Sequence, residues 1–252
     1  MSHHRPWRDT PSQPRTPCAT IGAMTIGFAH RGARLDEREN TMPAFRRALE
    51  QGATGLESDA WVAADGEVVL VHDAVVRTGL RRLHVHRATS EELGRLGVPR
   101  LRDLYETLGT DFELSLDLKE HAAAPRVIEV AQASTGALER LWLCSPDVDL
   151  LTELRDVPGG LHLVHSARKK RITGTLERHA ADLRSRRVDA MNMHHTDWTK
   201  GLVSLFHRFD VAAFAWDVQE TRYLRDALQM EIDAVYCDRV DRMMAAVGEW
   251  GA

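Results

Sequence analysis

The 252-residue chain lacks several features that would assign it to a common class at once. No apolar run approaches the roughly 18 residues that a membrane-spanning helix needs. The three cysteines, Cys18, Cys144 and Cys237, lie far apart without C-x-x-C spacing, which excludes a disulfide framework and a cysteine-based zinc motif. Such cysteine usage is typical of a reducing compartment, so we expect a cytoplasmic protein. We also expect no stable membrane association.

A basic surface is also absent. Asp and Glu outnumber Lys and Arg by 37 to 33, and the formal net charge is -4. Nucleic-acid-binding proteins usually need a basic face, so we expect no nucleic-acid partner. The chain does contain 43% hydrophobic and 28% charged residues, which are the proportions of a globular protein with a full core.

The first 23 residues are rich in Pro, Ser, Thr and Arg and offer little to pack in a core. They lack the long apolar segment of a secretory signal. We interpret residues 1–23 as a flexible leader, with Met24 as an alternative start, and expect one folded domain over residues 24–252.

From residue 24 onward, β-rich segments alternate with helical patterns. The segment TMPAFRRALEQG has apolar residues at helical spacing, and Ala64-Asp65-Gly66 predicts a hairpin-like turn between the strands TGLESDAWV and EVVLVHD. Strands are expected to begin near residues 25, 55, 112, 141, 160, 189, 211 and 234, with helices near 124–135, 147–156, 175–186, 199–208, 219–229 and 239–248. About eight βα units in about 230 residues favour a TIM (β/α)8 barrel. A doubly wound sheet is the alternative, but no glycine-rich phosphate loop follows the first strand.

Polar side chains interrupt these apolar strands at their carboxyl ends, where TIM barrels place catalytic groups. They are His30 and Arg31, Glu57 and Asp59, His72 and Asp73, and Asp117 and Lys119. Because residues two apart in a strand point to the same side, Glu57 and Asp59 converge, as do Asp117 and Lys119. Each pair alone would more often be a solvated strand end, but together they predict a functional site.

The residue types indicate a chemistry. Three carboxylates at one barrel mouth repel one another unless a cation lies between them, and oxygen ligands without cysteine favour Mg²⁺ or Ca²⁺. Arg31 and Lys119 would supply positive charge for an anion, and the two histidines would move protons. These are the needs of phosphodiester cleavage, with a small-molecule phosphodiester as substrate.

The segments HRG, ENT, LESDAWVAADGEVVLVHD, LDLK, WDVQ and DAVYCD resemble those of the glycerophosphodiester phosphodiesterase family. The resemblance extends over residues 26–245 and implies a TIM barrel of the PLC-like phosphodiesterase type. It implies hydrolysis of glycerophosphodiesters to sn-glycerol 3-phosphate and an alcohol with a divalent cation. The implied roles are acid/base catalysis by His30 and His72, metal binding by Glu57, Asp59 and Asp117, and substrate binding by Arg31, Lys119, Asn40 and Trp216.

Two positions depart from the family pattern. Asp117 stands where the family usually has Glu, so its carboxylate is one methylene shorter. In WDVQ, Asp217 replaces a Thr, which puts a carboxylate in place of a neutral hydroxyl near the pocket rim. The segment after His72-Asp73 is shorter than in many relatives, which suggests a more open pocket.

Other polar groups receive no role. The basic loop SARKKR, residues 166–171, should lie at the same mouth, although a solvated loop is the favoured interpretation. Asn192 and His194 end a strand and are equally well explained by a structural role. His84 and His86 are spaced like metal ligands but lack a third partner nearby in sequence, so we interpret them as loop residues.

Two other functions stay open. A phospholipase D-like enzyme of the same barrel group, acting on lysophospholipid or sphingomyelin, would share the histidines and the E-x-D pair. A non-catalytic barrel that binds phosphodiesters would explain Asp117 and Asp217 as signs of decay. The sequence also leaves open which histidine is the acid, which alcohol is released, whether Ca²⁺ or Mg²⁺ binds, whether a cyclic phosphate forms, and the oligomeric state.

Overall fold

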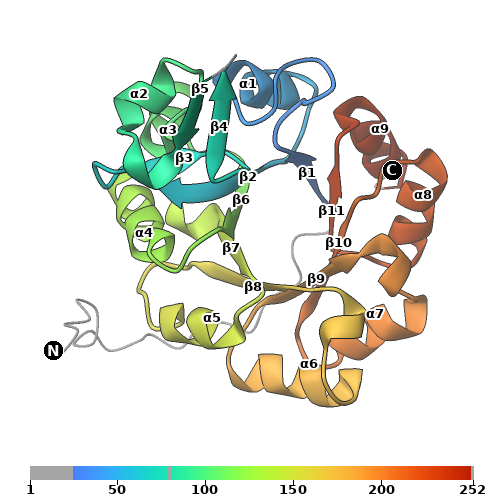
Figure 1. The fold of residues 1–252 in the computed structure, drawn as a ribbon. Helices are drawn as coiled ribbons and strands as arrows, with labels where there is room; N and C mark the ends of the chain where they lie inside the picture. The colour runs from blue at the N-terminus through green and yellow to red at the C-terminus, as the bar shows by residue number, and fades with distance from the viewer. Residues whose placement is uncertain (1–24, 79–80, 251–252) are drawn as a thin grey trace, which may run out of the picture.

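A closed ring of parallel strands forms the centre of the molecule (Figure 1). The computed structural model describes residues 25–78 and 81–250, so the expected leader, residues 1–23, lies outside the described residues. The ring strands are β1 (Ile26–His30), β2 (Gly55–Val62), β6 (Glu113–Leu118), β7 (Leu141–Ser145), β8 (His162–Ser166), β9 (Ala190–His194), β10 (Ala212–Trp216) and β11 (Ala234–Cys237). Because β1 pairs with both β11 and β2, this parallel sheet closes on itself, which confirms the predicted TIM barrel.

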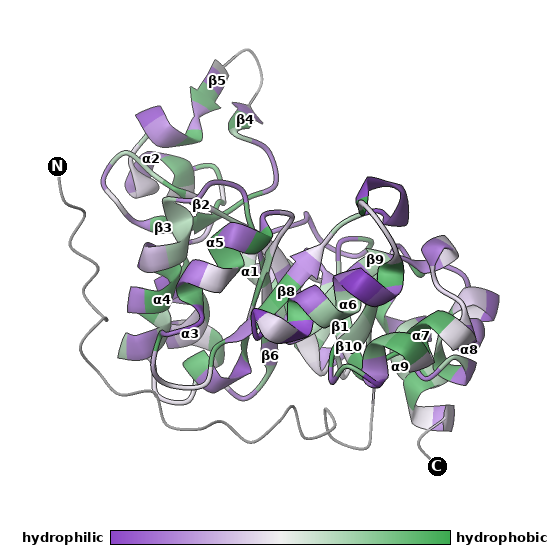
Figure 2. Ribbon diagram, turned by 90° about the horizontal axis from the view of Figure 1, so that it is seen from below, coloured by the Kyte–Doolittle hydropathy of each residue, from purple (hydrophilic) through white to green (hydrophobic). Residues whose placement is uncertain are grey.

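Helices surround the ring and connect its strands (Figure 1). They are α1 (Met42–Glu50), α3 (Leu101–Leu108), α4 (Ala123–Ala133), α5 (Val148–Leu154), α6 (Leu176–Ser185), α7 (Lys200–His207), α8 (Thr221–Gln229) and α9 (Val240–Trp250). Thr41, Thr175 and Thr199 each accept a backbone N–H of the first turn of the helix that follows, which explains where these helices begin. Hydrophobic and hydrophilic stretches alternate along the helices in Figure 2, as expected where one face packs on a barrel.

None of the helices in the described part of the chain is long and apolar enough to cross a bilayer.

The chain makes an excursion between β2 and β6 that the sequence analysis largely missed. The predicted Asp65-Gly66 turn is confirmed, since β3 (Val68–Leu70) pairs antiparallel with β2. A hairpin of β4 (Val75–Thr78) and β5 (Arg81–His84), a 3₁₀ turn (η1, Val85–Arg87) and the short helix α2 (Ser90–Gly94) then follow. Figure 2 shows this hairpin projecting from the barrel. His84 ends a strand, so its interpretation as a loop residue is wrong.

The inside of the barrel changes from apolar to polar along the strands. Phe28 and Tyr236 stack with ring centroids 4.8 Å apart, and the Tyr236 hydroxyl lies 3.0 Å from Ser115 Oγ. Two residues further along the same strands come His30, Asp238 and Asp117. Because side chains alternate in a strand, these polar residues lie on the same inner side, one layer closer to the C-terminal mouth.

Half-buried carboxylates hold the opposite end of the barrel together. Asp189, directly before β9, accepts the backbone N–H of Leu163 at 2.7 Å and pairs with Arg155 at 2.8 Å. The Arg155 side chain is only 4% exposed and also donates to backbone carbonyls. Asp233, directly before β11, repeats the arrangement with His207. Each carboxylate thus connects a strand to its neighbour and to a nearby basic side chain.

We predict that Arg155→Ala lowers the free energy of unfolding by about 3 kcal/mol, because it leaves the Asp189 carboxylate unpaired in a largely buried place. Chemical denaturation measures this difference. The matched control is Arg186→Ala, which removes exposed pairs with Asp149 and Asp182 and should cost less than about 1 kcal/mol. Equal losses in the two variants would contradict the prediction.

Candidate active site

A cavity of about 560 Å³ opens at the carboxyl ends of the strands. Its wall includes eight of the residues that the sequence predicts for the site: His30, Arg31, Glu57, Asp59, His72, Asp117, Lys119 and Trp216. Asn40 lies directly behind this wall, where its side-chain amide donates to Asp59 Oδ2 at 3.1 Å. The structure therefore brings all the predicted site residues together at one place.

Asp59 is the most enclosed carboxylate of the pocket. Its side chain is 3% exposed, and Lys119 Nζ donates to Oδ1 at 2.7 Å while Arg31 Nε lies 3.5 Å from Oδ2. Burial alone would raise the pKa of Asp59, but the charges of Lys119 and Arg31 and the Lys119 hydrogen bond outweigh it and lower that pKa. Asp59 is therefore ionised and joins two cations.

The turn from β1 to α1 brings Arg31 and Asn40 to the mouth. Both residues have positive φ angles, 58° and 53°, which are uncommon for residues other than glycine. The Asn40 backbone N–H donates to the Arg31 carbonyl at 3.0 Å, and its side-chain carbonyl accepts from Ser58 at 2.7 Å. Gly32 has φ +80°, and a Cβ there would meet Ala44 backbone atoms 2.7–2.9 Å away. These contacts fix a strained turn at the edge of the pocket.

Glu57 and Asp117 are the two carboxylates of the acidic set whose pKa values are raised. Burial, with further contributions from Asp59 and Asp117, raises the pKa of Glu57 to about 8, although His30 acts in the opposite direction. Glu57 also accepts the Arg31 backbone N–H at 3.0 Å. Burial and Asp59 likewise raise the pKa of Asp117, whose side chain keeps 40% of its surface open to the pocket. Burial and the crowding of carboxylates therefore favour the protonated form of both side chains in the pocket.

Each predicted catalytic histidine is bonded to a carboxylate through Nδ1. His30 Nδ1 lies 2.7 Å from Asp238 Oδ1, and His72 Nδ1 lies 2.8 Å from Asp73 Oδ1. An Nδ1–H that donates to a carboxylate leaves Nε2 available, and His30 Nε2 points toward Glu57 at 3.9 Å. Burial lowers the pKa of His30, but Glu57 and Asp238 outweigh this and raise it above its ordinary value.

Several pocket residues escaped the sequence analysis. Asp238 ends the segment DAVYCD, and its position after a strand was the available signal, but its contact with His30 joins positions 208 residues apart. Glu39 accepts from Arg31 at 3.0 Å and also pairs with Arg34. Arg34 lines the pocket itself, so the mouth has more cations than were predicted.

The basic loop lies at the mouth, as expected. Arg168 and Arg171 line the pocket, and the Arg168 guanidinium lies over the Trp216 ring, 5.7 Å from its centroid. Asn192 also lines the pocket, and its side-chain oxygen is buried without a hydrogen-bond partner among the described residues. This side of the mouth therefore offers positive charge and an unsatisfied acceptor.

The acidic trio of Glu57, Asp59 and Asp117 fits a hard cation in its donor atoms, which are all oxygen. Lys119 Nζ bridges two of the three carboxylates, at 2.7 Å from Asp59 and 3.2 Å from Asp117. Within residues 25–78 and 81–250, the trio is not among the groups whose ligand atoms all lie within 4.8 Å of one another. A cation bound here would compete with Lys119 for the carboxylates.

We predict that Asp238→Asn lowers the pKa of His30, because the neutral amide no longer stabilises the imidazolium. An NMR titration of the histidine ring resonances measures the shift. The control is Asp73→Asn, which alters the partner of His72 and should leave the His30 titration in place. A His30 titration that is the same in wild type and Asp238→Asn would contradict the role given to Asp238.

Known proteins with similar sequences agree on one family. The model of the glycerophosphoryl diester phosphodiesterase family matches residues 30–242. A glycerophosphodiester phosphodiesterase of Bacillus altitudinis is 24% identical over 87% of this chain and 96% of its own length. Human glycerophosphodiester phosphodiesterase 1 is 31% identical over a segment that covers 48% of this chain and 39% of the human protein.

Solved structures show the same fold. The glycerophosphodiester phosphodiesterase of Thermotoga maritima superposes with a TM-score of 0.77 and 26% identity, over 88% of this chain and 97% of that one. A phosphodiesterase of Oleispira antarctica, solved in complex with the product sn-glycerol-3-phosphate, superposes with a TM-score of 0.76 and 19% identity, over 89% and 97% of the two chains. The chain belongs to the glycerophosphoryl diester phosphodiesterase family.

Proposed function

We propose that this protein hydrolyses glycerophosphodiesters to sn-glycerol 3-phosphate and an alcohol, with His30 and His72 as the acid/base pair. The observation that best supports this is the pair of histidines in the wall of one pocket, each bonded through Nδ1 to a carboxylate. A carboxylate on Nδ1 orients an imidazole and adjusts its basicity, so that Nε2 can take or give a proton.

The phosphate would bind between Arg31 and Lys119. Both cations are held by Asp59 in the free protein, so they are positioned before the substrate arrives. Arg31 also bonds Glu39, and an incoming phosphate would compete with that carboxylate for the guanidinium. Fixed positive charge of this kind stabilises the charge that builds on the phosphoryl oxygens as the ester bond breaks.

A divalent cation, Mg²⁺ or Ca²⁺, would be held by Glu57, Asp59 and Asp117. When bound, it would polarise a phosphoryl oxygen. Burial, with a further contribution from the neighbouring carboxylates, raises the pKa values of Glu57 and Asp117, and a bound cation would relieve this cost, which supports the assignment. Lys119 Nζ lies 3.2 Å from Asp117 Oδ2, so lysine and metal would both draw on the same carboxylate.

The function is tested with glycerophosphocholine, glycerophosphoethanolamine and lysophosphatidylcholine, followed by ³¹P NMR of the products. We expect glycerol 3-phosphate from the first two, with a fall in kcat of about a hundredfold or more in His30→Gln or His72→Gln. His121→Ala is the control, because this exposed histidine pairs with Asp147 outside the pocket. Turnover of the lysolipid alone would support the phospholipase D-like alternative, and no turnover of any of them would support a binding barrel.

Metal affinity should rise with pH below about 8. Because the pKa of Glu57 is about 8, this carboxyl is mostly protonated at pH 7, and a cation must displace its proton. We expect the apparent Mg²⁺ affinity to increase by about tenfold per pH unit below pH 8 and to level off above it. Calorimetry in buffers of different ionisation enthalpy counts the protons released. Binding that is independent of pH in the wild type would exclude Glu57 as a ligand.

A further inference from the structure

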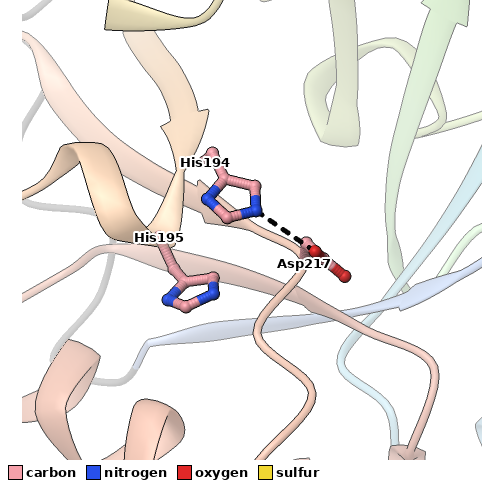
Figure 3. Close-up of side chains that lie close together, drawn as sticks. All are labelled: His194, His195 and Asp217. Atoms are coloured by element: carbon pink, nitrogen blue, oxygen red, sulfur yellow. Dashed lines mark hydrogen bonds and ion pairs between the residues drawn. The ribbon is translucent and has the colours of Figure 1, made fainter.

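A second cluster of ligand-type side chains lies on the rim of the mouth, outside the acidic trio. His194 ends β9, His195 follows it, and Asp217 follows β10 (Figure 3). One ligand atom from each of the three lies within 4.8 Å of the others. Figure 3 shows the two imidazoles side by side with the carboxylate facing them, and His194 Nε2 lies 3.2 Å from Asp217 Oδ2.

The two imidazoles have nitrogen atoms available for a ligand. His194 Nδ1 accepts the Thr196 backbone N–H at 3.2 Å and lies 2.7 Å from Thr196 Oγ1, so the ring proton lies on Nε2, which faces Asp217 Oδ2 at 3.2 Å. A divalent ion would replace this proton and bind Nε2. The ring nitrogens of His195 have no hydrogen-bond partner among the described residues, while Tyr223 packs 4.4 Å from its ring. Packing therefore holds the His195 ring in place, and its nitrogen atoms are available to a ligand.

The backbone at Asp217 directs a carboxylate toward these rings. Its φ angle is +61°, a conformation that is costly for most residues with a side chain, and its side chain is 51% exposed. Oδ2 faces His194, and Oδ1 accepts from Gln219 Nε2 at 3.3 Å. An exposed side chain can move the short distance needed to close around an ion. This carboxylate stands at one of the two positions where the sequence departs from the expected family pattern.

We propose that His194, His195 and Asp217 form a second metal site, for a late first-row divalent ion of the Zn²⁺ type. Two imidazoles and one carboxylate form a ligand set that suits Zn²⁺, Co²⁺ or Ni²⁺, whereas Mg²⁺ and Ca²⁺ prefer oxygen ligands alone. Three protein ligands leave a coordination position for water or a ligand oxygen.

The charges around the cluster affect how strongly it would bind a cation. The nearby Arg168 opposes the binding of a cation, but its guanidinium pairs with Asp197 at 2.8 Å, which offsets part of that charge.

The cluster also lies between two cavities. Asp217 lines the candidate active site, while His195 lines a groove of about 810 Å³ outside it, together with Tyr223 and Trp198. A bound ion would tie the ends of β9 and β10 together and hold Asp217 on the rim.

The test is titration of the full chain with Co²⁺ in excess Mg²⁺, followed by visible absorption, with equilibrium dialysis of Zn²⁺ as a second readout. We expect one ion per chain that Mg²⁺ does not displace. His195→Ala and Asp217→Asn should each weaken binding by about tenfold or more, because the first removes a direct ligand and the second replaces a charged ligand with a neutral amide. Thermal unfolding monitors the fold of each variant, and Asp217→Asn is the safer of the two, because the side chain is exposed and asparagine tolerates the positive φ angle of this position.

Two controls separate this site from others. Glu57→Gln removes a carboxylate of the acidic trio and should leave the Co²⁺ spectrum unchanged, and His121→Ala removes an exposed histidine that pairs with a carboxylate elsewhere. The proposal is overturned by a wild type that binds no Co²⁺ in excess Mg²⁺, by binding that survives both rim variants, or by binding that disappears in Glu57→Gln. Because the readout is binding, the result is independent of hydrolytic activity.

Discussion

The pairing of one buried carboxylate, Asp59, is the interaction on which the barrel mouth depends. A charge that is 3% exposed is stable only when opposite charges and hydrogen bonds surround it. Lys119 comes from the end of β6, Arg31 from the end of β1 and Asn40 from the approach to α1, so this single carboxylate aligns three segments. The two cations proposed to bind phosphate are consequently ordered by the acidic group proposed to bind metal. Binding substrate and metal then redistributes contacts that already exist instead of assembling a site from mobile side chains.

Strand register explains why these particular groups meet. In the parallel pairing, His30 lies opposite Glu57 in β2, and Asp59 lies opposite Asp117 in β6. The pairing of neighbouring strands therefore places His30 beside the carboxyl of Glu57. It also places the carboxylates of Asp59 and Asp117 together, beside Lys119. A slip of one residue would send these side chains to the opposite face of the sheet, where the helices pack. The chemistry of the mouth and the stability of the closed sheet thus depend on the same register.

Much of this arrangement could be predicted from the sequence, because it rests on local patterns. The period of two in Glu57-x-Asp59 and Asp117-x-Lys119, together with the βα alternation, places the polar groups on one edge of the barrel. The contact between His30 and Asp238 could not be predicted this way, since it joins the first strand to the last through closure of the ring. The hairpin of β4 and β5 escaped because its strands are short and rich in arginine, so no alternating apolar pattern marks them.

Asp217 shows how one position at a strand end can change the chemistry of a barrel mouth without altering its frame. A hydroxyl there could only donate or accept a hydrogen bond, whereas the carboxylate faces two imidazoles and adds negative charge to a rim that contains Arg168 and Arg171. Oxygen-only and nitrogen-rich ligand sets select different ions, so an acidic trio deep in the pocket and an imidazole cluster on the rim need not compete for one metal. The barrel tolerates this because its strand ends lie outside the packed core, where a new side chain costs little folding free energy. A side-chain change at such a position can therefore add a ligand site without altering the barrel frame.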